Sequence, residues 1–356
     1  MGTPVTMYVR EDAESSLNAV ILRPDDSFSI KLSRHRSAHR QPNVVTAGQF
    51  MLSNIYDSRG LVLLAATLGL LVSACESKQE GPETADTEAA RANVEAMAEQ
   101  HAEDTTEPSE AALVEPGQPI ISERLPYADV NDELVYGHFA FPADMVDPLP
   151  AIIVIHEWWG LNDNVRAMAD RLAGEGYIVL AVDLFSGGIA ATPEEARLLM
   201  SSVVEDPDPA SENIRQAYEF VRSTGGAPRI GSLGWCFGGG WSLNTAILFP
   251  EDLDAAVIYY GQVIDDEERL RPINVPILGL FGAADQGIPV DSVQQFEAAL
   301  ERLRKNYEIH IYPGAGHAFA NPTGRNYDAE AAEDSWQKTL EFLGHNLGGD
   351  SSSDAS

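Results

Sequence analysis

The chain has 356 residues and carries a formal net charge of -32 at pH 7, so its surface repels polyanions. Neither nucleic acid nor an anionic membrane surface is therefore expected as a direct partner. The chain has 2 cysteines, Cys75 and Cys236, and their surroundings predict different roles for them.

Residues 1–50 are predicted to be disordered, or to be an upstream extension that precedes a start at Met51. The reason is the apolar run at 61–74, which is too short to span a bilayer as a helix but suits the centre of a signal peptide, and a signal peptide lies at an N-terminus. The alternative for residues 61–75 is a buried apolar helix, but the acidic segment that follows offers it nothing to pack against.

The run ends in Leu71-Val72-Ser73-Ala74-Cys75, which resembles a bacterial lipobox. The resemblance implies that residues 51–75 are a lipoprotein signal peptide and that Cys75 is lipidated and becomes the new N-terminus. We therefore expect a protein that is exported and lipid-anchored to a bacterial membrane, facing the periplasm or the cell exterior. Its only membrane contact would be the lipid.

Residues 76–118 contain no Phe, Trp or Tyr and many acidic residues. Such a segment cannot bury enough apolar surface to offset the entropy lost on ordering, which predicts an acidic disordered tether. Its alanine-rich part, 89–102, is expected to be helical only transiently. The C-terminal residues 348–356 are also predicted to be disordered.

Strand and helix patterns alternate over residues 119–347. Apolar or alternating segments typical of strands occupy residues 134–141, 151–155, 177–182, 230–233, 255–260, 277–281 and 307–311. Helical spacing of apolar residues lies between them, as in Leu161, Val165, Met168 and Leu172 behind an Asn162-Asp163 cap. The pattern predicts one doubly wound α/β domain, with a mostly parallel sheet and helices on both faces.

The sequence Gly234-Trp235-Cys236-Phe237-Gly238 is typical of a nucleophile elbow, a sharp turn between a strand and a helix. It is the thiol form of the G-x-S-x-G motif of α/β-hydrolases. A cysteine at the helix N-terminus meets free backbone N–H groups that favour a thiolate. The alternative is a small buried cysteine in a glycine-rich turn.

Two further candidates follow later strands. Asp285 comes after the 277–281 strand and His317 after the 307–311 strand, so nucleophile, acid and base occur in the α/β-hydrolase order. His317 would accept the proton of Cys236, and Asp285 would orient the imidazole. Alternatively, Asp285 caps the helix after Pro289 and His317 is an ordinary turn histidine.

The remaining site residues flank the elbow and the loop after the 151–155 strand. The backbone N–H groups of Phe237 and Trp158 are predicted to form an oxyanion hole. The carboxylate of Glu157 is expected to contact either Cys236 or the substrate, with exposure to solvent as the alternative. Aromatic side chains predicted to line an apolar pocket are Trp158, Trp159, Trp235 and Phe319, with core packing as the alternative role.

Together, these motifs resemble the dienelactone hydrolase family over roughly residues 120–347. The resemblance is carried by Ile155-His156-Glu157-Trp158-Trp159-Gly160-Leu161-Asn162, Arg171-Leu172-Ala173, Gly176-Tyr177, Ala181-Val182-Asp183-Leu184, Gly234-Trp235-Cys236-Phe237-Gly238-Gly239, Asp285 and Gly316-His317. It implies an α/β-hydrolase fold and a Cys-His-Asp hydrolase of esters or lactones. It also implies that Glu157 pairs with the resting thiol and exchanges partner when substrate arrives.

The chain departs from the family pattern at the arginines that bind a substrate carboxylate. Asn321 stands where an arginine is expected after His317, and residues 185–188 contain none. This departure predicts neutral esters or lactones as substrates, unless Arg325 supplies the missing charge.

No cofactor is predicted. An H-E-x-x-H or paired-cysteine motif is missing from the sequence, which gives no indication of a metal, and no G-x-G-x-x-G follows the first strand. Two other functions remain open: a tethered α/β domain that binds a ligand or partner without catalysis, and a redox thiol, which would lack a second cysteine to resolve it.

We predict that a bacterium expressing the full chain cleaves it before Cys75 and retains the product in its membrane fraction, whereas Cys75→Ala is not lipidated. Mass spectrometry of the N-terminal peptide checks this. An unmodified Cys75 inside a continuous peptide would contradict it.

Overall fold

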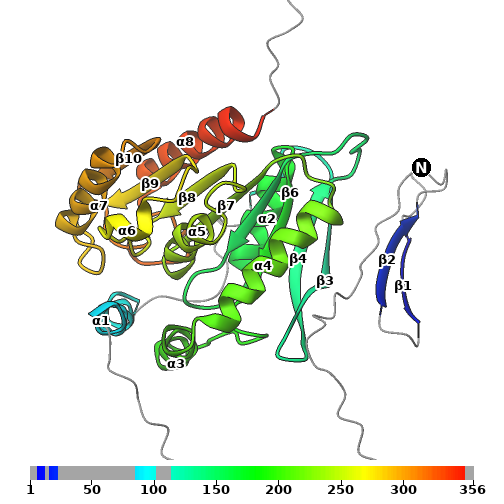
Figure 1. Cartoon of the computed structure of the whole chain (residues 1–356), viewed down its shortest axis with the longest axis horizontal. Coiled ribbons are helices and arrows are strands. Elements are labelled where there is room, and N and C mark those ends of the chain that lie inside the picture. Colours follow the sequence, from blue (N-terminus) through cyan, green and yellow to red (C-terminus); the bar gives the residue numbers. More distant parts are fainter. Residues whose placement is uncertain (1–5, 13–15, 23–84, 102–113, 349–356) are drawn as a thin grey trace, which may run out of the picture.

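The computed structural model describes residues 6–12, 16–22, 85–101 and 114–348 (Figure 1). The predicted signal peptide at 51–75, including Cys75, and residues 349–356 lie outside these ranges. Within the first 50 residues, β1 (Thr6–Asp12) and β2 (Ser16–Leu22) pair as an antiparallel hairpin, which differs from the expectation of disorder there.

The core of the protein is an 8-stranded sheet with the order β10-β9-β8-β7-β5-β6-β4-β3. Its strands are β3 (Ile120–Val130), β4 (Glu133–Pro142), β5 (Ala151–Ile155), β6 (Ile178–Val182), β7 (Ile230–Trp235), β8 (Ala255–Tyr259), β9 (Ile277–Gly282) and β10 (Tyr307–Tyr312). Strands β5 to β10 pair in parallel, whereas β3 and β4 are antiparallel. Every residue of β5 and β6 is buried, as their unbroken apolar sequences predict.

Helices cover both faces of the sheet, which confirms the predicted doubly wound, single-domain α/β-hydrolase fold (Figure 1). They are α2 (Asp163–Gly174), α3 (Pro193–Glu205), α4 (Asp208–Ser223), α5 (Phe237–Leu248), α6 (Glu267–Leu270), α7 (Val290–Arg302) and α8 (Ala329–Leu347). The Asn162 side chain accepts a hydrogen bond from the Val165 N–H and caps α2 as expected.

A further helix, α1 (Ala85–Gln100), lies beside α3 (Figure 1). The sequence predicted a disordered tether over 76–118, and within it the structure forms this packed helix. Val94, Met97 and His101 lie on one side of the helical segment and are each at most 2 % exposed. A single buried face of this kind is stabilised by the folded domain that it meets, which the composition of the segment does not reveal.

Contacts with α3 and with the loop that contains Gly287 help to hold α1 against the domain. Glu95 forms an ion pair with Arg197 of α3 at 3.2 Å, and the Met97 and Gln100 side chains pack closely against Gly287.

Among the described residues, no helix combines the length and apolar content needed to cross a membrane.

Candidate active site

The turn between β7 and α5 places Cys236 in a strained backbone conformation, with φ = 55° and ψ = −118°. Such a backbone conformation is unfavourable for any residue other than glycine, and it recurs at functional sites. The turn also brings backbones unusually close together. A Cβ at Gly234 would meet the Gly238 carbonyl, and a Cβ at Gly238 would meet the Ile155 carbonyl, so the elbow requires glycine at both positions.

Asp285 and His317 face each other across the loops that follow β9 and β10. The Nδ1 atom of His317 lies 2.7 Å from Oδ2 of Asp285, and both side chains are fully buried. The other carboxylate oxygen of Asp285 accepts hydrogen bonds from the backbone N–H groups of Gly287 and Ile288. Asp285 is therefore fixed, and it directs the Nε2 atom of His317 away from itself.

The reactive atoms of Cys236 and His317 lie within 4.8 Å of each other. Nε2 of His317 is buried without a hydrogen-bond partner among the described residues. A thiol and an imidazole at this separation are close enough to pair after a small side-chain rotation, and catalytic hydrogen bonds are often long before substrate binds.

Charge pairing decides the protonation of these groups. Burial acts to raise the pKa of the Cys236 thiol, but the nearby charge of His317 and the contact with His101 outweigh it and lower the pKa from 9.0 to about 6. Burial acts to lower the pKa of His317, but the charges of Cys236 and Asp285 raise it to about 10. At neutral pH the pair is therefore a thiolate beside an imidazolium.

Helix α1 covers this thiolate, which sequence reasoning missed. The Met97 Sδ atom lies 3.7 Å from the Cys236 Sγ atom, and Nε2 of His101 lies 3.9 Å from it. The His101 ring stacks on Trp158, with ring centroids 4.9 Å apart. As a result Cys236 is only 2 % exposed.

The Glu157 carboxylate is buried and hydrogen-bonded beside the elbow. It accepts hydrogen bonds from Asn321 Nδ2 at 2.7 Å and from the Tyr260 hydroxyl at 3.4 Å. Burial and the negative charges of Glu157 and Cys236 raise the pKa of Tyr260, which keeps its hydroxyl protonated as a donor. The role of Tyr260 had no signal in the sequence. Asn321 stands at the position where the sequence pattern led us to expect an arginine, and in the structure it is a hydrogen-bond donor to Glu157.

His156 fixes the loop that carries Glu157 and Trp158. Its Nε2 atom accepts a hydrogen bond from the Leu184 N–H at 3.0 Å, so Nδ1 carries the proton and donates to the Glu157 carbonyl at 2.7 Å. Burial lowers the pKa of His156, which favours this neutral form. The loop after β5 is thus tied to the loop after β6.

The two predicted oxyanion donors lie on neighbouring strand ends. Phe237 is the first residue of α5, and Trp158 follows β5. Strands β5 and β7 are paired, with Ile155 opposite Gly234, so both loops leave the same edge of the sheet. This placement brings the two residues to the same edge of the sheet as Cys236.

The residues predicted to line the substrate pocket do not gather around one cavity. A cavity of about 20 Å³ is lined by Glu157, Asn164, Val165, Met168, Trp235, Tyr260, Ala320, Asn321 and Pro322. Trp235 is therefore both a wall residue and a core residue packed on Tyr259. Trp159 is buried beside Trp158, Phe319 is fully buried in the core, and Arg325 is exposed.

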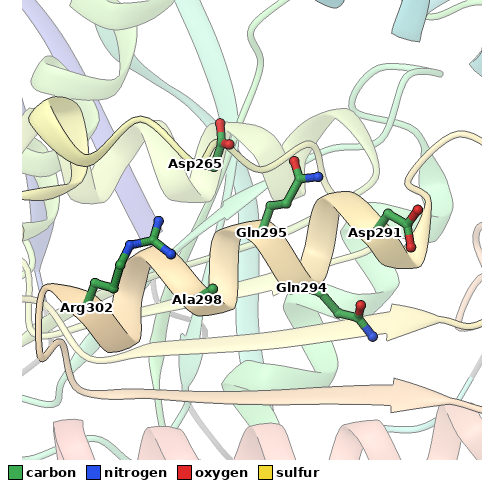
Figure 2. Close-up of a pocket in the computed structure, with 6 residues that line it drawn as sticks. All are labelled: Asp265, Asp291, Gln294, Gln295, Ala298 and Arg302. Atoms are coloured by element: carbon green, nitrogen blue, oxygen red, sulfur yellow. The ribbon is translucent and has the colours of Figure 1, made fainter.

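A larger hollow of about 270 Å³ runs along α7 and is lined by Asp265, Asp291, Gln294, Gln295, Ala298 and Arg302 (Figure 2). These side chains include no cysteine, serine or histidine and none of the predicted site residues. The hollow therefore offers no thiol, hydroxyl or imidazole for acyl transfer, unlike the elbow with Cys236.

The sheet order, with the elbow after a central parallel strand, defines a hydrolase of the α/β-hydrolase fold. Comparison with protein families gives the particular family. Residues 135–347 match the dienelactone hydrolase family, and the chain belongs to it.

Similar proteins agree with this assignment. A Saccharolobus solfataricus protein with the provisional name carboxymethylenebutenolidase is 36 % identical, over 57 % of this chain and 92 % of its own. An Escherichia coli K12 protein with the same provisional name is 34 % identical, over 58 % of this chain and 80 % of its own. A crystal structure of a provisionally named dienelactone hydrolase from Klebsiella pneumoniae superposes with a TM-score of 0.58 at 29 % identity, covering 64 % of this chain and 99 % of that one.

We predict that the Cys236 thiol titrates near pH 6, below its usual value of 9.0, because the imidazolium of His317 stabilises the thiolate. The measurement is the ultraviolet thiolate absorbance against pH, taken as the difference between the wild type and Cys236→Ser. In His317→Gln the midpoint should rise from its wild-type value, since the largest opposing contribution to burial, the charge of His317, is then lost. Equal midpoints in the wild type and His317→Gln would contradict the pairing.

Proposed function

We propose that this member of the dienelactone hydrolase family cleaves neutral carboxylic esters or lactones through an acyl-cysteine intermediate, with Cys236, His317 and Asp285 as nucleophile, base and acid. The observation that carries the proposal is the buried Asp285–His317 hydrogen bond of 2.7 Å beside a cysteine in an elbow. The family of the chain and the names of its relatives support the reaction class.

The first half-reaction forms the intermediate. The thiolate of Cys236 attacks the carbonyl carbon, and the backbone N–H groups of Phe237 and Trp158 stabilise the oxyanion. The C–O bond then breaks, and the leaving alkoxide takes a proton from the His317 imidazolium. In a lactone the leaving oxygen stays attached to the acyl group.

The second half-reaction releases the acid. Neutral His317 removes a proton from a water molecule, which attacks the thioester carbon and expels the Cys236 thiolate. The protonated imidazole returns to its pairing with Asp285 and the thiolate. One ester bond and one water molecule are consumed, and no cofactor is needed.

The surroundings of Glu157 favour a neutral substrate. Among the described residues that line the small cavity beside the elbow, none is a lysine or arginine, whereas Glu157 contributes a carboxylate. The Asn321 amide hydrogen-bonds this carboxylate but cannot neutralise it. A substrate carboxylate placed here would lose its hydration without gaining a cation, which is costly in a buried site.

A second candidate substrate class is an anionic dienelactone-type lactone, which the names of the relatives favour. It would require Arg325 to move toward the site. The lipobox-like sequence ending at Cys75 adds the separate proposal that the hydrolase works while lipid-anchored outside the cytoplasm.

We predict that Cys236→Ala or His317→Ala lowers kcat for p-nitrophenyl acetate by roughly a thousandfold or more, because nucleophile and base act as a unit. Asp285→Asn should lower kcat by a similar or smaller factor through the wrong imidazole tautomer. The exposed His345→Ala is the matched control and should keep wild-type turnover. Near wild-type turnover by Cys236→Ala would contradict the acyl-cysteine mechanism.

We also predict that kcat/KM is at least about a hundredfold higher for a neutral aryl ester than for the same ester bearing a carboxylate on its acyl group. The preference should narrow at higher ionic strength, because salt screens the negative surface. Arg325→Ala is the comparison that separates the two substrate classes. A strong preference for the anion that disappears in Arg325→Ala would place the substrate carboxylate at Arg325 instead.

A further inference from the structure

The docked α1 brings a third potential metal ligand to the candidate catalytic pair. The ligand atoms of His101, Cys236 and His317 all lie within 4.8 Å of one another, and each residue is at most 2 % exposed. The three residues come from distant parts of the chain: the end of α1, the elbow before α5 and the loop after β10. All three ligand atoms are present at the site only when α1 is docked.

The donor set and its spacing suit zinc. Two imidazoles and one thiolate are common Zn²⁺ ligands, with Zn–N bonds of about 2.0 Å and Zn–S bonds of about 2.3 Å. These bond lengths place neighbouring ligand atoms roughly 3.3 to 3.8 Å apart in a tetrahedral or trigonal arrangement. The separation of 3.9 Å between His101 Nε2 and Cys236 Sγ is close to that range. A small inward rotation of the three side chains would complete it.

The groups around the cluster also match those of a zinc site. Asp285 accepts a hydrogen bond from Nδ1 of His317, so the opposite nitrogen can bind a metal once the metal displaces its proton, as in carboxylate–histidine–zinc arrangements. That Nε2 atom is buried and has no hydrogen-bond partner within the described residues. A metal ion would satisfy it.

The charges of such a cluster balance. One Zn²⁺ ion, the Cys236 thiolate and the Asp285 carboxylate sum to zero when both histidines are neutral. A buried cluster without net charge avoids the large desolvation cost of an uncompensated ion. The neighbouring Met97 thioether, 3.7 Å from the cysteine sulfur, helps to exclude water and is compatible with a soft or borderline metal.

We propose that docked α1 completes a zinc site formed by His101, Cys236 and His317, and that bound zinc holds the hydrolase closed. Zinc at this position occupies the lone pairs of both the proposed nucleophile and the proposed base, so hydrolysis stops. When α1 leaves, one of three ligands leaves with it, zinc affinity falls and the thiolate becomes accessible. Zinc binding and α1 docking therefore stabilise each other.

The test measures metal binding on the full chain, without substrate. The wild type, stripped with a chelator and dialysed against Zn²⁺, should retain one zinc per chain. With Co²⁺ as the probe it should show a thiolate-to-cobalt charge-transfer band. His101→Ala should weaken zinc binding by at least about a hundredfold and change this band, since a direct ligand is lost. His345→Ala, an exposed histidine, is the matched control and should bind as the wild type does.

A second pair of variants tests the dependence on α1 without touching a ligand. Val94 is buried in the docked face, whereas Ala92 is exposed on the same helix. Val94→Arg should weaken zinc binding and relieve the inhibition of ester hydrolysis by zinc. For each variant, turnover in the presence of zinc is compared with turnover of the same variant in chelator. Ala92→Arg should do neither.

Three results would overturn the proposal. They are the absence of stoichiometric zinc in the wild type, an unchanged zinc affinity and cobalt band in His101→Ala, and an unchanged zinc affinity in Val94→Arg. The metal measurements need no turnover. A failure here therefore leaves the acyl-cysteine mechanism standing, and a failure of that mechanism leaves these measurements intact.

Discussion

The pairing of the Cys236 thiolate with the His317 imidazolium is the interaction on which the other features of the site depend. Two opposite charges are buried together, and neither would remain ionised alone because burial disfavours each charged form. The Asp285 carboxylate, held by two backbone N–H groups, supplies the second negative charge that keeps His317 protonated. The strained elbow then serves to hold the sulfur at that point.

This buried charge pair also explains why a covering element is useful. A thiolate next to an imidazolium is reactive, and α1 shields it with the Met97 thioether and the His101 ring. Full burial of Val94 and Met97 contributes roughly 1.5–3 kcal/mol each, before the cost of ordering the helix is subtracted. The exposed Glu95–Arg197 pair adds at most about 1 kcal/mol. Few side chains carry the docking of α1, so a metal ligand shared with the domain would strengthen it.

Much of the fold was predictable because most of its parallel strands are apolar on both faces. The segment predicted at 151–155 matches β5, and those at 277–281 and 307–311 end one residue short of β9 and β10. Other elements had no such signal. The edge strand β3 contains Glu123 and Arg124 side by side and a proline at position 126, and α3 buries only Ala196, Met200 and Val203. The family was recognised from the elbow and the His156-Glu157-Trp158-Trp159 loop, and the match confirms it.

The site was less predictable, since its partners are set by tertiary contacts. Nothing local in the sequence couples Asn321 or Tyr260 to Glu157, and nothing in an acidic, alanine-rich segment indicates that His101 reaches Cys236. Phe319, expected in the pocket wall, is fully buried next to Tyr259 and Tyr260, because its loop turns the ring toward the sheet.

The most direct test of the central claim is to trap the covalent intermediate. The full chain is mixed with p-nitrophenyl acetate in the presence of a chelator, quenched in acid within the first turnover, and digested for mass spectrometry. The account predicts one acetyl group on the peptide that contains Cys236, and none on that peptide in Cys236→Ala. Steady turnover with no label on Cys236, or with the acetyl group on another side chain, would contradict it.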